Sequence, residues 1–179
     1  ALHDLIALSS PELSEVFVID HSTTSAEAAS STGGRRGKGG DILWRWGNPT
    51  RHGSGDERDQ QLFRQHDPSW LAPTTSGALR LLVFNNGSER PFEDDRSAVL
   101  ELELPFDPVR GFVVPERGPH GPVRPTWRFE DAPRFYSAFV SGAQRLPNGN
   151  TLVCSGAAGR VFEIDPDGHI VWELSLIHI

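Results

Sequence analysis

The sequence is poor in cysteine and lacks methionine altogether. Its 179 residues include one cysteine, Cys154, which excludes an internal disulfide framework and a cysteine-based zinc site. No apolar run approaches the ~18 residues of a membrane-spanning helix, so we expect no membrane span. Cys154 itself lies in an apolar, strand-like run, where we expect it to be buried and inert.

Positive charge is also in short supply. The chain has 17 Lys and Arg against 24 Asp and Glu, a net charge of −7 with histidine neutral. Because nucleic-acid binders neutralise phosphates with a basic face, we expect no nucleic-acid partner. Turn formers are abundant instead, with 18 Gly and 14 Pro, and there are 5 Trp. This composition favours a turn-rich β protein over a helix bundle.

Three segments of the chain repeat one order of elements. Each has two apolar strands followed by a third strand centred on a tryptophan, namely Trp44, Trp127 or Trp172. The second and third units also have a strand in front. The expected strands are 4–10, 15–20 and 41–46; then 65–71, 81–87, 98–103 and 125–129; then 141–146, 150–156, 160–165 and 169–173. Four short strands per unit, with a tryptophan near the end, are typical of a propeller blade.

We therefore predict an all-β fold, an incomplete β-propeller of about two and three-quarter four-stranded blades with long inter-strand loops. The partial propeller spans 1–173. Its blades are 2–47, which lacks a first strand, 63–130 and 137–173. Residues 174–179 resemble a translated sequencing adapter, so we expect a non-native tail there and treat the chain as an internal fragment.

Three insertions interrupt the repeat. Thr24-Ser-Ala-Glu27 predicts a capping box and a short helix between two strands of the first unit. Residues 56–65 favour a short helix or coil that gives way to strand near His66. Residues 105–125 contain six prolines and predict an ordered, irregular loop or lid.

Six stretches, in this order along the chain, closely resemble the arylsulfotransferase (aryl-sulfate sulfotransferase) family. They are 15–24, 33–41, 44–48, 60–67, 83–87 and 135–150, within a resemblance that covers about residues 4–173. The resemblance implies a six-bladed propeller, exported to the periplasm or secreted, with its site at one mouth of a central channel. It also implies sulfuryl transfer from an aryl sulfate to a phenol through a sulfated histidine, without a nucleotide sulfate donor.

The resemblance implies that His66, within Gln65-His66-Asp67, is the nucleophile. A neutral imidazole is a competent nucleophile near pH 7, because its free pKa is about 6.5. Cations should surround the sulfuryl oxygens, and Arg64, Arg90 and Arg145 are the candidates for binding the anionic substrate. Strand alternation should turn Asp67 away from His66, to brace a loop. We expect no cofactor and no metal.

A second interpretation stays open. The family motif has an arginine after a Ser-Ser pair, whereas this chain has Pro11 after Ser9-Ser10. A histidine at a propeller mouth can also serve as a hydrogen-bonding fastener between blades. The alternative function is therefore a non-catalytic propeller that binds a ligand or a protein partner. In either case we expect this fragment alone to show no turnover, because a site assembled from several blades is incomplete in it.

Overall fold

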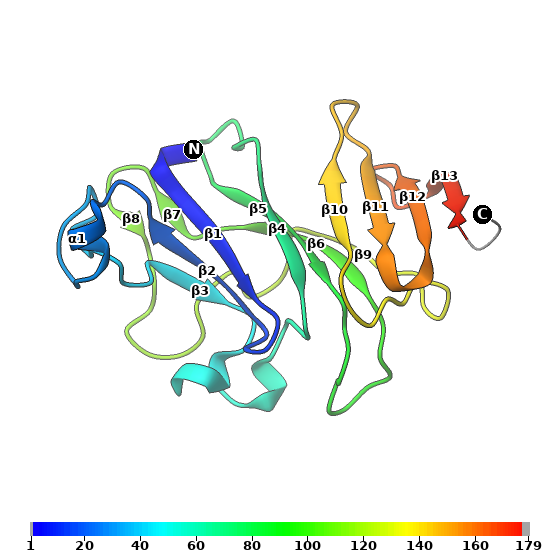
Figure 1. Ribbon diagram of the computed structural model, residues 1–179, viewed down its shortest axis with the longest axis horizontal. Helices are drawn as coiled ribbons and strands as arrows, with labels where there is room; N and C mark the ends of the chain where they lie inside the picture. The colour runs from blue at the N-terminus through cyan, green and yellow to red at the C-terminus, as the bar shows by residue number, and fades with distance from the viewer. Residues whose placement is uncertain (1, 177–179) are drawn as a thin grey trace.

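A computed structural model describes residues 2–176 and shows an all-β fold with only short helices (Figure 1). Within these residues, 13 strands form four antiparallel sheets. The prediction of an all-β fold is therefore confirmed. In the part of the chain described, no helix has the length and apolar character needed to cross a membrane.

The first sheet is a three-stranded meander. Its strands are β1 (Leu5–Ser10), β2 (Glu15–Asp20) and β3 (Trp44–Trp46), in that order. The segment between β2 and β3 includes the short helix α1 (Ser25–Ala28). Thr24 caps this helix and exchanges hydrogen bonds with Glu27, so the predicted capping box is confirmed.

Two four-stranded sheets follow, each a meander in chain order. The second sheet consists of β4 (His66–Leu71), β5 (Arg80–Asn85), β6 (Ala98–Glu103) and β9 (Trp127–Phe129). The third sheet consists of β10 (Gly142–Arg145), β11 (Thr151–Ser155), β12 (Arg160–Ile164) and β13 (Ile170–Ser175). The remaining elements are short: β7 (Phe106–Asp107), β8 (Gly111–Phe112), and the 3-10 turns η1 (Leu2–Asp4), η2 (Pro49–His52), η3 (Glu57–Asp59) and η4 (Gly156–Ala158).

The second sheet is buried on both faces, between the first sheet and the third (Figure 1). Along β5, Leu81 and Val83 join the apolar cluster shared with the first sheet. The alternate residues Leu82 and Phe84 join the cluster shared with the third sheet. This alternation explains why β5 is a continuous apolar run, since a strand covered on both faces has no side for polar residues.

The three repeat tryptophans occupy equivalent positions in their sheets. Each pairs with the fourth residue of the preceding strand, as Trp44 with Val18, Trp127 with Glu101 and Trp172 with Glu163. The Trp44 indole donates to the Gly121 carbonyl at 2.8 Å, and the Trp127 indole donates to the Pro166 carbonyl at 3.2 Å. In both cases the acceptor lies in the connection that enters the last strand of the next sheet. The same bond therefore ties the first sheet to the second and the second to the third.

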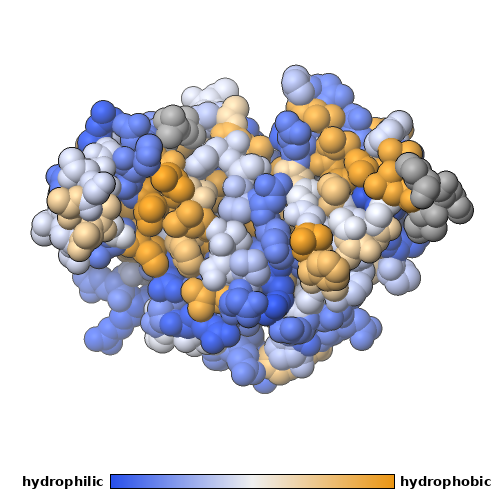
Figure 2. Space-filling model, in the orientation of Figure 1, coloured by the Kyte–Doolittle hydropathy of each residue, from blue (hydrophilic) through white to orange (hydrophobic). Residues whose placement is uncertain are grey.

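Trp172, at the equivalent position of the third sheet, is 48% exposed. Figure 2 shows apolar side chains gathered over the region of β11 to β13, and the exposed ones on β13 are Val171, Trp172 and Leu174. β13 continues two residues beyond the predicted end at 173, because Leu174 and Ser175 pair with Val161 and Arg160. Of the predicted tail 174–179, residues 177–179 lie outside the described residues, and its non-native origin stays a prediction.

The proline-rich insertion packs back onto the first sheet. The β7–β8 hairpin places Phe106 and Phe112 against the first apolar cluster. Further along the insertion, the Pro122 carbonyl accepts a hydrogen bond from the Trp46 indole at 2.8 Å. The predicted ordered loop is therefore present, with a short hairpin inside it.

The prediction that Cys154 is buried was wrong, because its side chain is exposed. Along β11 the buried residues are Thr151, Val153 and Ser155, so strand alternation turns Cys154 to the opposite face. The flanking apolar residues concealed this alternation in the sequence.

Candidate functional site

The His66 imidazole lies at the first residue of β4 and is held by Asn86. Its Nδ1 lies 2.7 Å from Asn86 Oδ1. The amide nitrogen of Asn86 donates to the carbonyls of Ser137 and Val140 at 2.7 and 2.8 Å, which fixes the orientation of the amide group. Because Oδ1 can only accept, Nδ1 of a neutral His66 carries the proton and Nε2 carries the lone pair.

The other ring nitrogen of His66, Nε2, is not completely buried. Within the described residues, Nε2 makes no hydrogen bond and is not among the buried atoms that lack a partner. His66 is partly buried at this position. The arrangement leaves a nitrogen lone pair accessible on a ring whose opposite side is fixed.

The backbone around His66 adopts left-handed conformations that are unusual for residues other than glycine. Arg64 has φ of 56° and Asp67 has φ of 54°. Val140, whose carbonyl binds Asn86, has φ of 50°, and Ser141 has φ of 98°. Such conformations are costly, above all for a β-branched valine, and they persist where surrounding contacts enforce them. Their concentration around one imidazole marks this region as a candidate site.

A buried serine network holds Asn86 in place. Ser97 Oγ donates to the Asn86 carbonyl at 2.8 Å and accepts the Ser137 N–H at 2.9 Å. Ser137 Oγ accepts from Ser141 Oγ at 2.8 Å and from the Ala157 N–H at 3.0 Å. The network joins the β5–β6 connection to the segment before β10 and to η4. Prearranged polar contacts of this kind keep a functional side chain in one geometry.

The two neighbours of His66 fasten the second sheet to the other two. Gln65 is buried, and its amide nitrogen donates to Ser9 Oγ at 3.0 Å and to the Glu15 carbonyl at 2.8 Å in the first sheet. Asp67 accepts the Ala143 N–H at 3.1 Å in the third sheet. Asp67 was expected to brace a loop and not the His66 ring; it is bonded away from the ring, but its partner lies in strand β10 and not in a loop.

Arg64 faces the turn between β1 and β2. Its guanidinium forms a bidentate pair with Glu12 at 2.9 and 2.8 Å, and Glu89 lies 4.0 Å away. Arg64 lines a polar cavity of about 330 Å³ together with Glu12 and Arg51. Arg64 precedes β4 and has a left-handed backbone, so the alternation of side chains along the strand does not set its direction. His66 itself lines none of the four main cavities found in the described part of the chain.

The two other predicted guanidiniums lie elsewhere. Arg145 pairs with Glu101 at 2.8 Å and stacks over Trp127, with its Cζ atom 5.1 Å from the ring centroid. Arg90 stacks over Phe63 in a separate cavity, with its Cζ atom 4.7 Å from the ring centroid. The described contacts bring neither of them to His66, and their predicted roles in substrate binding stay predictions.

A second group of titratable side chains, not singled out from the sequence, lies beside β3. Glu15 is fully buried and forms a bidentate pair with Arg45, and His52 Nδ1 lies 3.2 Å from a Glu15 oxygen. His120 accepts the Arg45 N–H at 3.4 Å. Burial, followed by the positive charge of Arg45, lowers the pKa of His52. The pKa of His120 is also lowered, by burial first and then by His52 and Arg45. The proline-rich insertion brings His120 next to Arg45. Sequence motifs around His120 gave no indication of this contact, because the two residues are 75 positions apart.

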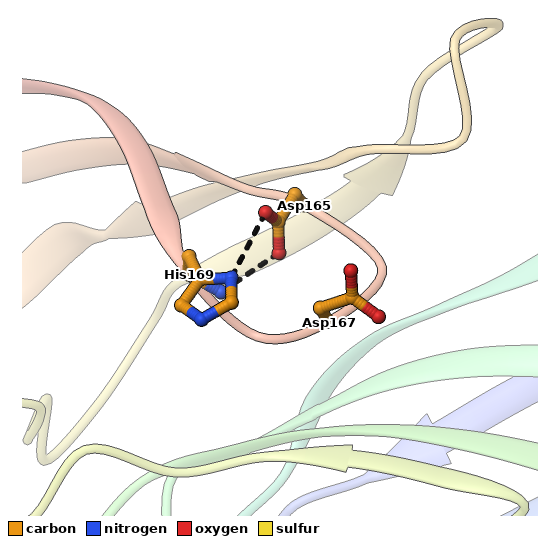
Figure 3. A group of neighbouring side chains, drawn as sticks. All are labelled: Asp165, Asp167 and His169. Atoms are coloured by element: carbon orange, nitrogen blue, oxygen red, sulfur yellow. Dashed lines mark hydrogen bonds and ion pairs between the residues drawn. The ribbon is translucent and has the colours of Figure 1, made fainter.

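Figure 3 shows a third group, Asp165, Asp167 and His169, in the turn between β12 and β13. Their possible ligand atoms lie within 4.8 Å of one another, and Asp167 and His169 are exposed. Asp165 accepts the His169 N–H at 2.8 Å and lies 3.1 Å from His169 Nδ1. The first of these bonds is the main reason that the pKa of Asp165 is lowered. Hydrogen bonding within the turn accounts for the group, and we assign no metal to it.

Serial antiparallel sheets tied by equivalent tryptophans, with a fixed imidazole at the start of the edge strand β4, define an all-β class of protein. The model of the family "Arylsulfotransferase (ASST)" matches residues 4–165, and the chain belongs to this family. No curated protein matches the chain. Among solved structures, a protein of unknown function from Bacteroides caccae has 14% identity and a TM-score of 0.41. That match covers 92% of this chain, which spans 40% of the Bacteroides chain.

Proposed function

We propose that this chain is part of an arylsulfotransferase in which His66 receives a sulfuryl group from an aryl sulfate and passes it to a phenol. One observation carries the proposal: the Asn86 amide fixes the proton on His66 Nδ1 and leaves Nε2 accessible with its lone pair. A nucleophilic imidazole needs this tautomer and this exposure. A histidine that only fastened two sheets would have no need of a free nitrogen.

The transfer takes two displacements at sulfur. In the first, the Nε2 lone pair forms an N–S bond, the bond from sulfur to the aryl oxygen breaks, and that oxygen leaves with the electron pair as a phenolate. In the second, the oxygen of the acceptor phenol forms a bond to sulfur, and the N–S electron pair returns to Nε2. The acceptor loses its proton to solvent or to a base. His66 Nδ1–H donates to Asn86 throughout, which stabilises the ring while it carries the sulfuryl group.

We propose that the three sheets are consecutive blades of a propeller, with the boundaries 2–47, 63–130 and 137–173. The repeated tryptophan bond between neighbouring sheets supports this arrangement, as does the burial of the second sheet on both faces. Further blades would complete the substrate site. Turnover therefore belongs to the complete protein and not to these residues alone. We propose that the complete protein is exported to the periplasm or secreted.

Arg64 is the guanidinium that we propose for the anionic donor. It pairs with Glu12, one residue after Pro11, at the turn where the family pattern has an arginine. Glu12 is 78% exposed, and an ion pair with so exposed a partner contributes little to stability. A sulfate monoester can therefore compete with Glu12 for the Arg64 guanidinium.

The complete protein should be incubated with 4-nitrophenyl sulfate and a phenol acceptor. We expect nitrophenolate release that His66→Ala abolishes. The matched control is His21→Ala, which removes an exposed histidine from the β2–β3 segment and should leave the rate unchanged. Undiminished transfer by the His66→Ala protein would eliminate the proposal.

Pro11 favours the second candidate function, a propeller that binds a ligand or a protein partner without chemistry. The roles of Gln65 and Asp67 as fasteners between sheets fit this reading as well. Saturable binding of aryl sulfates by a complete protein that transfers no sulfuryl group would support it. Measured turnover that depends on His66 would exclude it.

A further inference from the structure

We infer that a cavity beside β6 and β9 is a binding site for a small aromatic oxyanion, separate from His66. Its volume is about 280 Å³, which suits a single substituted ring. We call it the arginine cavity, because four guanidiniums line it along with two phenylalanines: Arg58, Arg90, Arg96, Arg128, Phe63 and Phe92. Neither the family match nor the proposed sulfuryl transfer assigns a role to this cavity.

Arg90 is the buried charge at the centre of the argument. Its side chain is only 8% exposed, and its ion-pair partner, Glu93, lies 3.6 Å away. Its Nε atom is buried without a hydrogen-bond partner, and one terminal nitrogen donates to the Arg96 carbonyl over a long 3.4 Å. A buried guanidinium is stable when an anion accepts its hydrogen bonds at short range. An oxyanion in the cavity would supply oxygen atoms to accept the hydrogen bonds of Arg90, for which the protein offers only long contacts.

The lining of the arginine cavity carries more guanidiniums than carboxylates. The lining includes the carboxylates of Glu57 and Glu93 against four guanidiniums. Glu130, close by, is shared between Arg96 and Arg128. Asp95 also lies nearby, where it accepts the Arg90 backbone N–H at 3.1 Å, so the excess of positive charge belongs to the lining alone. Burial, and then the positive charge of Arg96, lowers the pKa of Arg90, as expected for a buried cation whose ion pair with Glu93 is long, at 3.6 Å.

The apolar part of the lining favours an aromatic ligand over a bare anion. The Phe63 ring is already covered on one side by Arg90, and Phe92 is 63% exposed. Leu100 and Pro125 add further apolar surface to the lining. An exposed phenylalanine beside an arginine cluster offers a ring ligand a stacking partner next to the group that binds its charge.

The arginine cavity and His66 lie on different sides of the end of β5. Asn85 lines the cavity, and its Oδ1 accepts the Phe63 N–H at 2.8 Å. The next residue, Asn86, turns its side chain to His66. Consecutive residues of an extended chain point to opposite faces, so the two asparagines serve two separate sites.

The test is calorimetric titration of the chain with phenyl phosphate, compared with inorganic phosphate. We expect saturable binding of phenyl phosphate at least about 10-fold tighter than that of phosphate. Phe92→Ala should remove this preference, and Arg128→Gln should weaken binding by about 10-fold, since a charge-assisted contact is lost. Both residues are accessible at the surface, and circular dichroism would verify that each variant folds.

Two controls separate this inference from the proposed transfer. Arg134→Gln removes a guanidinium that is 78% exposed and pairs with Asp131, away from the cavity, and should leave binding unchanged. His66→Ala should also leave it unchanged, whatever its effect on sulfuryl transfer. No saturable binding up to about 10 mM phenyl phosphate, or binding lost in His66→Ala but kept in Arg128→Gln, would overturn the inference.

Discussion

At the scale of single residues, the distinctive feature is an imidazole whose protonation pattern is set by an asparagine. Asn86 is fully buried, and its amide makes three hydrogen bonds, of which the one to His66 selects the tautomer. The sequence identified His66 as a candidate through family resemblance. It gave no sign of the role of Asn86, because a tautomer depends on contacts between residues 20 to 54 positions apart.

The tautomer can be measured directly by nitrogen NMR of the imidazole side chains. The neutral His66 ring should carry its proton on Nδ1, because Asn86 Oδ1 can only accept. His21, which is exposed, provides the internal reference for a histidine without such a constraint. Protonation of Nε2 in His66 would contradict the assignment and would remove the proposed nucleophile.

Glu12→Gln tests the role of Arg64 in the complete protein. The substitution removes the carboxylate partner of Arg64 and frees its guanidinium for the sulfate group. We expect donor KM to fall several-fold with little change in kcat, and stability to change by less than about 0.5 kcal/mol. A higher KM, or no change while Arg64→Gln is also silent, would show that Arg64 does not bind the donor.

At the scale of the elements, most strands could be predicted from apolar periodicity and turn residues. The expected strand 98–103 coincides with β6, and 15–20 with β2. The ends of the strands were harder to predict. Residues 41–46 were expected to form a strand, whereas β3 begins only at Trp44. Leu43 still donates its N–H to the Val18 carbonyl of β2 at 2.9 Å, but the regular ladder begins only at Trp44. Where such pairing starts is a tertiary property that local pattern does not encode. The docking of the proline-rich insertion could not be predicted from the sequence either, since it depends on contacts of Trp44 and Trp46 with residues more than 70 positions away.

The docking of the insertion on the first sheet should depend on pH. The groups that face His120 are His52, Arg45 and Glu15, and the pKa values of both histidines are lowered in the folded state. The unfolded chain then binds more protons just below pH 6.5, so stability is full above about pH 6.5 and falls as pH decreases through the folded pKa values. Urea midpoints at pH 7 and pH 5 measure this loss.

His120→Gln is the matched variant for this pH effect, because the glutamine amide oxygen can still accept the Arg45 N–H. We expect it to reduce the difference between the two urea midpoints. His21→Gln, which changes an exposed histidine, should leave the difference as it is in the wild type. Equal pH dependence in the wild type and in His120→Gln would refute the role given to His120.

At the scale of the whole molecule, the chain is a series of sheets that stabilise one another face to face. The second sheet has apolar neighbours on both sides, and one type of tryptophan bond recurs at both junctions. The order of strands around each tryptophan could be predicted from the sequence because each sheet is formed by strands in chain order. The exposure of Trp172 could not be predicted from the sequence, since it depends on what packs against the third sheet.

Three tryptophan variants test this serial arrangement. Trp44→Phe should destabilise the chain by about 1–3 kcal/mol, because it leaves the Gly121 carbonyl without its donor. Trp127→Phe should cost about 1 kcal/mol, since its bond to Pro166 is more exposed. Trp172→Phe, at the same position of the third sheet, should change stability by less than about 0.5 kcal/mol. Urea unfolding of the three variants ranks them, and equal effects would argue against the serial arrangement.

The most direct test of the proposed function is peptide mapping of the complete protein after it reacts with 4-nitrophenyl sulfate in the absence of an acceptor. The account predicts one added sulfuryl group on the peptide that contains His66, and its loss when a phenol is supplied. A sulfuryl group on another side chain, or continued transfer with His66 unmodified, would contradict it.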